Sequence, residues 1–209
     1  MLGMSSTSVL ATATGPHIFW ITSRAAGIVA LVLSSVSVSV GLLMGRRLKK
    51  ARRPDLRIFH EALSLATLAA IAVHGLTLLG DQFMHPSLAD IAIPFVSSYK
   101  SVWTSIGIVA FWALLLLGLS YYARGRIGVQ RWRMLHRFTA LAWILGLVHS
   151  LGEGTDAGQA WFLAMTVIVA LPPLALLGTR WLGNGGASQP KAAPARPARA
   201  RSSRAHATR

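Results

Sequence analysis

Four histidines inside apolar sequence carry the most distinctive chemistry available to this chain. His60 and His74 lie on one apolar segment, and His136 and His149 lie on another. An ionisable side chain within a membrane span is costly, so it is a functional-site hypothesis by default. Neutral imidazole is a common metal ligand, and the chain has no cysteine. Two helices that each supply one histidine at two depths predict two stacked haem b groups with bis-histidine ligation.

The spacing of the histidines predicts how they pair. His60 and His74 are 14 residues apart, and His136 and His149 are 13 apart, which corresponds to about 21 Å and about 20 Å of helix. Matching by depth pairs His60 with His136 and His74 with His149. Fourteen residues return to within about 40° of one helix face, but thirteen leave a mismatch of about 140°. We therefore expect the second helix to be overwound or kinked, with Gly146 as the candidate bend, or the haems to be laterally offset.

The composition places the elements that position these histidines in a membrane. Hydrophobic residues make up 53% of the 209 residues, charged residues make up 13%, and the mean hydropathy is +0.52. Several stretches approach the length of about 20 apolar residues that a bilayer core requires. We predict an all-α fold, a polytopic membrane bundle of about five transmembrane helices with a disordered basic C-terminal tail. The predicted spans are Ile18 to Met44, Ile58 to Leu79, Val102 to Tyr122, Leu135 to Leu151 and Ala160 to Leu182.

The basic residues predict the orientation of the bundle. Of 21 Lys and Arg residues, seven lie in 46–57, five in 124–137 and seven in 180–209, all on one side of a five-helix arrangement. By the positive-inside rule that side is cytoplasmic, so the N-terminus is outside and the C-terminus inside a cell membrane. The net charge of +15 then requires no nucleic-acid partner, because topology accounts for it.

This arrangement divides the sequence into three segments. Residues 1–17 form an extracytoplasmic N-terminal segment, 18–182 a haem-binding transmembrane domain, and 183–209 a disordered basic cytoplasmic tail. The tail is either a solvated topology anchor, with contact to anionic membrane lipid, or a docking arm for an electron donor. In the outer loop, apolar residues around Pro94 predict a segment that lies in the membrane interface and caps the outer end of the bundle. They are Ile91, Ile93, Phe95 and Val96.

Arg24 and Trp143 are the remaining candidate cofactor-binding residues. An unpaired cation at the position of Arg24, just inside the outer face, would be expensive, and a propionate of the outer haem would satisfy it. The alternative is that Arg24 extends to the outer headgroups. Trp143 lies between the two histidine levels, as a packing wall or as an electron relay between the haems.

The sequence resembles a known family in the residues around these histidines. The run Trp132-Arg133-Met134-Leu135-His136-Arg137, followed by His149, resembles the W-x-x-L-H-R element of the ferric reductase-like transmembrane domain. That superfamily includes NADPH oxidases, ferric reductases and the haem-binding membrane subunit of the periplasmic methionine-sulfoxide reductase system. His60 and His74 match its other ligand pair, and Ser23 to Gly27 resembles its S/A-R-x-x-G opening. The resemblance implies two haems b on the four histidines, and a role for Arg24 near the outer haem.

The same resemblance implies electron transfer. Oxidases of the family add a flavin and NADPH domain, whereas this sequence has no glycine-rich nucleotide fingerprint. We therefore expect the membrane electron-transfer component of an oxidoreductase, which receives electrons from a separate flavin reductase or a quinol donor and passes them to an extracytoplasmic electron acceptor. A quinol-oxidising cytochrome b subunit of a larger complex is one alternative. A histidine-lined metal-ion or proton transporter is another, although only Glu61 offers a carboxylate near the spans.

Overall fold

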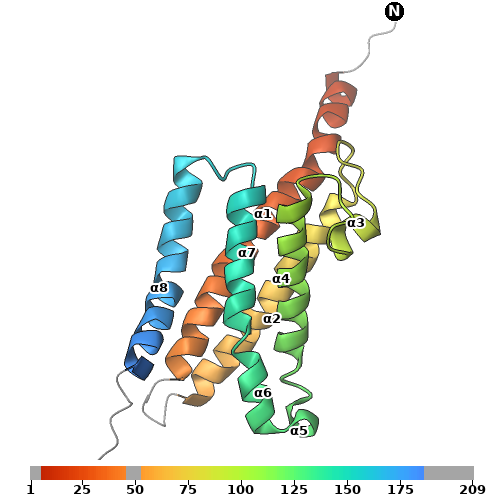
Figure 1. The fold of residues 1–209 in the computed structure, drawn as a ribbon. Coiled ribbons are helices and arrows are strands. Elements are labelled where there is room, and N and C mark those ends of the chain that lie inside the picture. Colours follow the sequence, from red (N-terminus) through yellow and green to blue (C-terminus); the bar gives the residue numbers. More distant parts are fainter. Residues whose placement is uncertain (1–5, 46–52, 186–209) are drawn as a thin grey trace, which may run out of the picture.

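The computed structural model describes residues 6–45 and 53–185, and within those ranges every regular element is a helix. The predicted all-α fold is therefore confirmed. Figure 1 shows the helices in chain order. They are α1 (Ser6–Met44), α2 (Arg53–Leu78), α3 (Leu88–Ala92), α4 (Ser101–Leu119), α5 (Arg124–Ile127), α6 (Val129–His136), α7 (Thr139–Glu153) and α8 (Ala160–Gly185).

Five stretches of the described chain are long and apolar enough to cross a membrane, as the sequence predicts. They are His17–Met44, Asp55–Leu78, Ser101–Leu119, Val129–Glu153 and Ala160–Leu182. Large apolar side chains face outward along them, among them Leu116 on α4 and Ile168 on α8. Lipid is the environment that makes such exposure favourable. The chain is a multi-pass membrane protein.

The two ends of the chain differ from the body of the bundle. The predicted N-terminal segment is largely helical from Ser6 onward, as a continuation of the first span. The predicted basic tail lies outside the described residues, apart from 183–185, which end α8.

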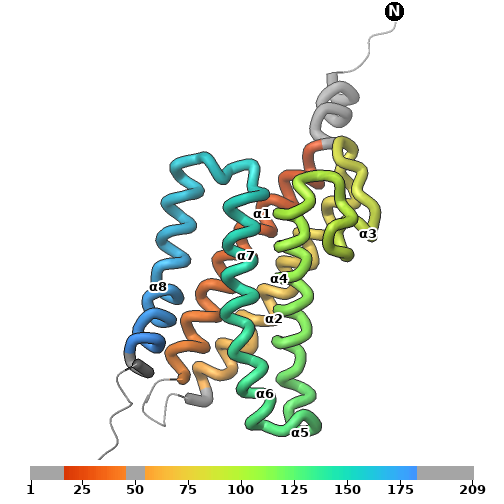
Figure 2. Tube along the Cα trace, in the orientation of Figure 1, coloured from red at the N-terminus to blue at the C-terminus, as the bar shows by residue number. Residues whose placement is uncertain are grey.

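The helices form two antiparallel pairs and one flanking helix. α1 packs along α2, α4 packs along α7, and α8 lies against α1. Smaller contacts join α1 to α7 and α2 to α4, so that α2 and α7 stand at opposite corners of a four-helix arrangement. The path of the chain through this arrangement can be followed in Figure 2. Both histidine-bearing spans thus face the middle of the bundle.

The fourth span is broken between its two histidines. α6 ends at His136 and α7 begins at Thr139, with Arg137 and Phe138 in a turn between them. The N–H of Phe138 donates to the Leu135 carbonyl at 3.0 Å, a bond three residues back. Such tight turns rotate the chain by about 120° per residue instead of about 100°. Of the alternatives expected for this helix, the structure shows a local tightening, and it lies at this turn and not at the candidate bend Gly146, which is within the continuous helix α7.

The loop between α2 and α4 lies beside the bundle. It contains α3, whose first turn is capped by reciprocal bonds between Ser87 and Asp90. After α3, the Trp112 indole N–H donates to the Ala92 carbonyl at 2.8 Å, and the Phe95 N–H donates to Ser105 Oγ at 2.7 Å. The apolar segment predicted to cap the outer end instead runs down the side of α4, because α4 side chains satisfy its backbone there (Figure 1).

Candidate functional site: two histidine pairs

The four histidines form two pairs across the centre of the bundle. The ring centres of His60 and His136 are 6.2 Å apart at an interplanar angle of 88°. Those of His74 and His149 are 6.3 Å apart at 72°. Metal–imidazole bonds of about 2.0–2.1 Å on opposite sides of one metal ion place two ring centres about 6 Å apart. The pairing expected from depth is the pairing that the structure has, and its separation suits one metal ion per pair.

Each histidine presents its Nδ1 atom to a backbone carbonyl of the neighbouring helix. A carbonyl only accepts hydrogen bonds, so Nδ1 carries the proton in the neutral ring and Nε2 keeps its lone pair. Fixing the tautomer in this way is the usual role of a group behind a metal-binding histidine. The four contacts are His60 to Ser37 O at 3.0 Å, His74 to Ser23 O at 2.8 Å, His149 to Trp103 O at 2.9 Å and His136 to Leu117 O at 3.5 Å.

A unit that occurs twice on α1, a serine followed four residues later by a glycine, holds the two histidines of α2. Ser23 and Ser37, which supply the carbonyls, also place Oγ 3.1 Å from Nδ1 of His74 and His60, respectively. Four residues after each serine stands a glycine whose missing side chain leaves room for the ring. A Cβ atom at Gly27 would lie 3.1 Å from His74 Nδ1, and one at Gly41 would lie 3.1 Å from His60 Cε1.

The histidines of the other half have less regular surroundings. A similar unit lies behind His149, with Trp103 in place of the serine. Gly107 follows Trp103 by four residues, and a Cβ atom there would lie 2.5 Å from His149 Nδ1. His136 has the longest carbonyl contact of the four, and its ring stacks on Trp132 at 5.0 Å and 27°. An aromatic face therefore supports the histidine that lacks a glycine partner.

Trp143 fills the space next to the two histidine levels. Its side chain is 1% exposed, and its indole N–H donates to Ser35 Oγ of α1 at 3.1 Å. Ser35 Oγ in turn donates to the Leu31 carbonyl. The indole therefore joins α7 to α1 between the two levels, and its role as packing wall or electron relay stays a prediction.

Arg24 has a partner within the chain. Its guanidinium forms an ion pair with the buried carboxylate of Asp156, in the turn between α7 and α8, and lies 5.0 Å from the Trp20 ring centre. Asp156 is 132 residues from Arg24 in the sequence, and the fold brings the two charges together. The predicted contact of Arg24 with a haem propionate stays a prediction.

Glu61 also binds another side chain of the bundle. The hydroxyl of Tyr122, just beyond α4, donates to its carboxylate at 2.7 Å, and this bond raises the pKa of the Tyr122 phenol. Glu61 thereby ties α2 to the chain that follows α4 at the predicted cytoplasmic end.

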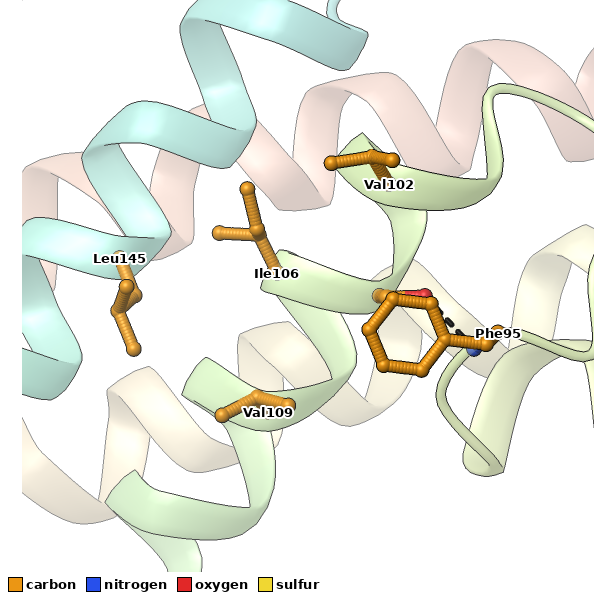
Figure 3. Close-up of a pocket in the computed structure, with 6 residues that line it drawn as sticks. Phe95, Val102, Ile106, Val109 and Leu145 are labelled. Carbon is orange, nitrogen blue, oxygen red and sulfur yellow. Dashed lines mark hydrogen bonds between the residues drawn. The ribbon is translucent and has the colours of Figure 1, made fainter.

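A small apolar pocket lies where the loop rests on α4. Its volume is about 130 Å³, and Figure 3 shows Leu145 of α7 facing the α4 side chains across it, with Phe95 on the far side. Its lining residues are Phe95, Val102, Ser105, Ile106, Val109 and Leu145. None of the four histidines lines it, so it is separate from the candidate site.

Fold and site together define a helical membrane protein built around paired histidines. Residues 26–147, more than half of the chain, match the family model described as the ferric reductase like transmembrane component. The chain belongs to this family, and its role is membrane electron transfer. The match includes His60, His74 and His136 and ends two residues before His149. Neither a curated protein nor a solved structure matches the chain in the corresponding comparisons.

Sequence reasoning missed the residues behind the histidines. Ser23 and Ser37 are 14 residues apart, as are Gly27 and Gly41, and this spacing equals that of His60 and His74. When two antiparallel helices contact each other at two points, the contacting residues are separated by about the same number of residues on both helices. That equality was a readable signal for the α1–α2 contact.

Proposed function

We propose that this protein binds two haem b groups, one between His60 and His136 and one between His74 and His149, and carries electrons between them. The observation that carries the proposal is the separation of about 6 Å within each pair. It is supported by the four carbonyl contacts that leave every Nε2 available.

The surroundings of the pairs let each imidazole lie close to the helix behind it. Gly27, Gly41 and Gly107 keep Cβ atoms away from the rings, so the histidines can approach their supporting helices closely. Within the described residues, no third histidine or carboxylate joins a pair to form a cluster that could hold a metal ion. Each pair thus offers two ligands, which suits an iron ion whose other four positions are filled by a porphyrin.

The cofactor, when bound, supplies one-electron chemistry at an iron whose oxidation state changes. The protein sets its environment. The carbonyls of Ser23, Ser37 and Trp103 hold the imidazole protons at Nδ1 and make the ligating nitrogens more basic. The buried Trp143 side chain lies between the two levels.

We infer an outward path for the electrons. A cytoplasmic flavoprotein or membrane quinol gives up electrons one at a time at the level of His60 and His136. They leave from the level of His74 and His149 to an extracytoplasmic acceptor, which is thereby reduced. This direction rests on the predicted positive-inside orientation in the cell membrane, with the N-terminus outside.

The ligand assignment is tested by single substitutions. His60→Ala or His136→Ala should remove one haem, and His74→Ala or His149→Ala the other, because each change removes one of the two histidines that would hold it. The haem content from a pyridine haemochrome assay should fall from about two per chain to about one. His85→Ala, in the loop outside the spans, is the matched control and should keep both haems. A wild-type protein without a Soret band would refute the proposal and favour a transporter.

The orientation requires a separate measurement. A reporter fused after Arg209 should read cytoplasmic, and one inserted near Asp156 should read external. The reverse labelling would exchange the donor and acceptor levels while leaving the haem ligands unchanged.

A further inference from the structure

An aromatic and basic cluster lies next to His136 at the predicted cytoplasmic end. Trp132 of α6 stacks on the His136 ring, and its own ring centre is 5.8 Å from that of Tyr121, which follows α4. We call Trp132, Tyr121, Arg57 and Arg124 the Tyr121 cluster. Its members come from α2, α5, α6 and the turn after α4, so four separate parts of the chain converge beside one histidine pair.

The cluster contains a hydrogen-bond donor without an acceptor. The Nε1 atom of Trp132 is buried and makes no hydrogen bond. A buried indole N–H without a partner is destabilising, and Trp is normally placed where this group can bond. The donor is also next to the ring of a candidate haem ligand. It therefore indicates an acceptor that belongs to a ligand of this site.

Two guanidinium groups add positive charge around the same point. The Arg124 Cζ atom lies 3.9 Å from the Tyr121 ring centre, and its Nη1 donates to the Tyr121 carbonyl at 2.8 Å. The Arg57 Cζ atom lies 5.7 Å from the same ring centre. Arg57 precedes His60 by three residues on α2, so it lies one turn from the other ligand of the pair. Stacking on Tyr121 leaves guanidinium N–H groups for an anion.

We propose that the Tyr121 cluster binds the propionate carboxylates of the haem held by His60 and His136, with the Trp132 indole N–H as one donor and Arg57 and Arg124 as the cations. This inference rests on the proposed function. Carboxylate is favoured over lipid phosphate because the unpaired donor is buried beside His136 and not at the surface. The two ends of the site differ here, since Arg24 at the other end already pairs with Asp156.

The test compares haem with haem whose propionates are blocked. The full-length protein, freed of haem, is reconstituted with haem b or with haem b dimethyl ester, which lacks the carboxylate charge. Trp132→Phe keeps an aromatic ring and removes the N–H, and Arg124→Gln removes one cation. Arg126→Gln, two residues along the same short helix and exposed, is the matched control for the loss of charge. Reduction potentials are measured in titrations that resolve both haems.

With haem b, Trp132→Phe and Arg124→Gln should lower the potential of the haem at His60 and His136, because an uncompensated carboxylate stabilises ferric iron. The haem at His74 and His149 and the Arg126→Gln control should not shift. With the dimethyl ester, the Trp132→Phe shift should disappear, and the Arg124→Gln shift should shrink to the direct effect of the lost cation on the iron. Equal shifts with both cofactors, or none with haem b, would overturn the proposal, and lipid phosphate would then be the remaining anion. If the wild type bound no haem, the proposed function itself would fail first.

Discussion

The two halves of the bundle hold their histidines by different means. In the α1–α2 half, two uninterrupted helices meet through a unit that occurs twice, with Ser23 and Gly27 behind His74 and Ser37 and Gly41 behind His60. In the α4–α7 half, the unit occurs once, and the helix that carries the histidines is broken at Arg137. Each half nevertheless presents two imidazoles at matched levels.

The difference shows that histidines with two different sequence spacings can reach matched positions when the geometry of the helix between them also differs. Fourteen residues nearly restore the direction of a side chain on a straight helix, so α2 needs no break. Thirteen residues do not, and the tight turn at Phe138 adds rotation in the direction that reduces the mismatch. The 13-residue spacing and the break between α6 and α7 occur in the same span, and the surroundings of His136 are correspondingly less regular.

The largest effect should come from changing the register of α7. One alanine inserted between Leu141 and Ala142 rotates His149 by about 100° relative to His136. His149 would then turn away from His74, and haem content should fall from about two per chain to about one. An alanine inserted between Gly158 and Gln159, in the turn before α8, should leave both haems bound. Retention of both haems in the first variant would mean that the break closes and that the new 14-residue interval restores the direction of His149.

Substitutions of the glycines test whether the histidines need the space that a missing side chain leaves on the supporting helix. Gly107→Ala places a methyl group 2.5 Å from His149 Nδ1, whereas Gly27→Ala places one 3.1 Å from His74 Nδ1. Overpacking of this kind costs about 1–3 kcal/mol, so Gly107→Ala should weaken haem binding at this level more than Gly27→Ala. Gly75→Ala, which faces open space beside His74, is the control. Haem dissociation rates give the order, and equal rates for all three variants would contradict it.

The ion pair between Arg24 and Asp156 tests how the halves are joined at the predicted outer end. The Arg24 side chain is 34% exposed, so loss of the pair should cost on the order of 1 kcal/mol of stability. If Arg24 also compensates a haem propionate, Arg24→Gln should lower the potential of the haem at His74 and His149, while Asp156→Asn should not. Thermal unfolding and a redox titration of both variants separate the two roles. An unchanged potential in Arg24→Gln would leave only the ion pair.

The smallest effect should come from the serine hydroxyls. Ser23→Ala and Ser37→Ala remove Oγ but keep the backbone carbonyls that bind His74 and His60. A hydrogen bond of this kind contributes about 0.5–1.5 kcal/mol, so both haems should stay bound with small shifts in potential. Loss of a haem in either variant would show that the hydroxyl, and not the carbonyl, fixes the imidazole.

The sequence predicted the features that depend on composition and periodicity. Apolar runs predicted five spans, and the depths of the histidines predicted their pairing, because helix rise per residue is constant. The position of the break was predicted wrongly. Gly146 is a common kind of bend residue, but the tight turn formed at Arg137 and Phe138, whose side chains give no such signal. The partner of Arg24 was missed because Asp156 is distant in sequence and joins it only through the packing of three helices.

The 14-residue interval on α2 also determines how strongly the membrane voltage acts on the protein. About 21 Å of helix separates the two histidine levels in a hydrocarbon core about 30 Å thick. In the proposed path, an electron moving between them would cross roughly two thirds of the transmembrane field, which amounts to about 1.5 kcal/mol per 100 mV. With the cell interior negative by about 100 mV, the voltage would favour outward movement by about tenfold at equilibrium. The driving force of the proposed electron transfer thus depends on the membrane voltage as well as on the donor and the acceptor.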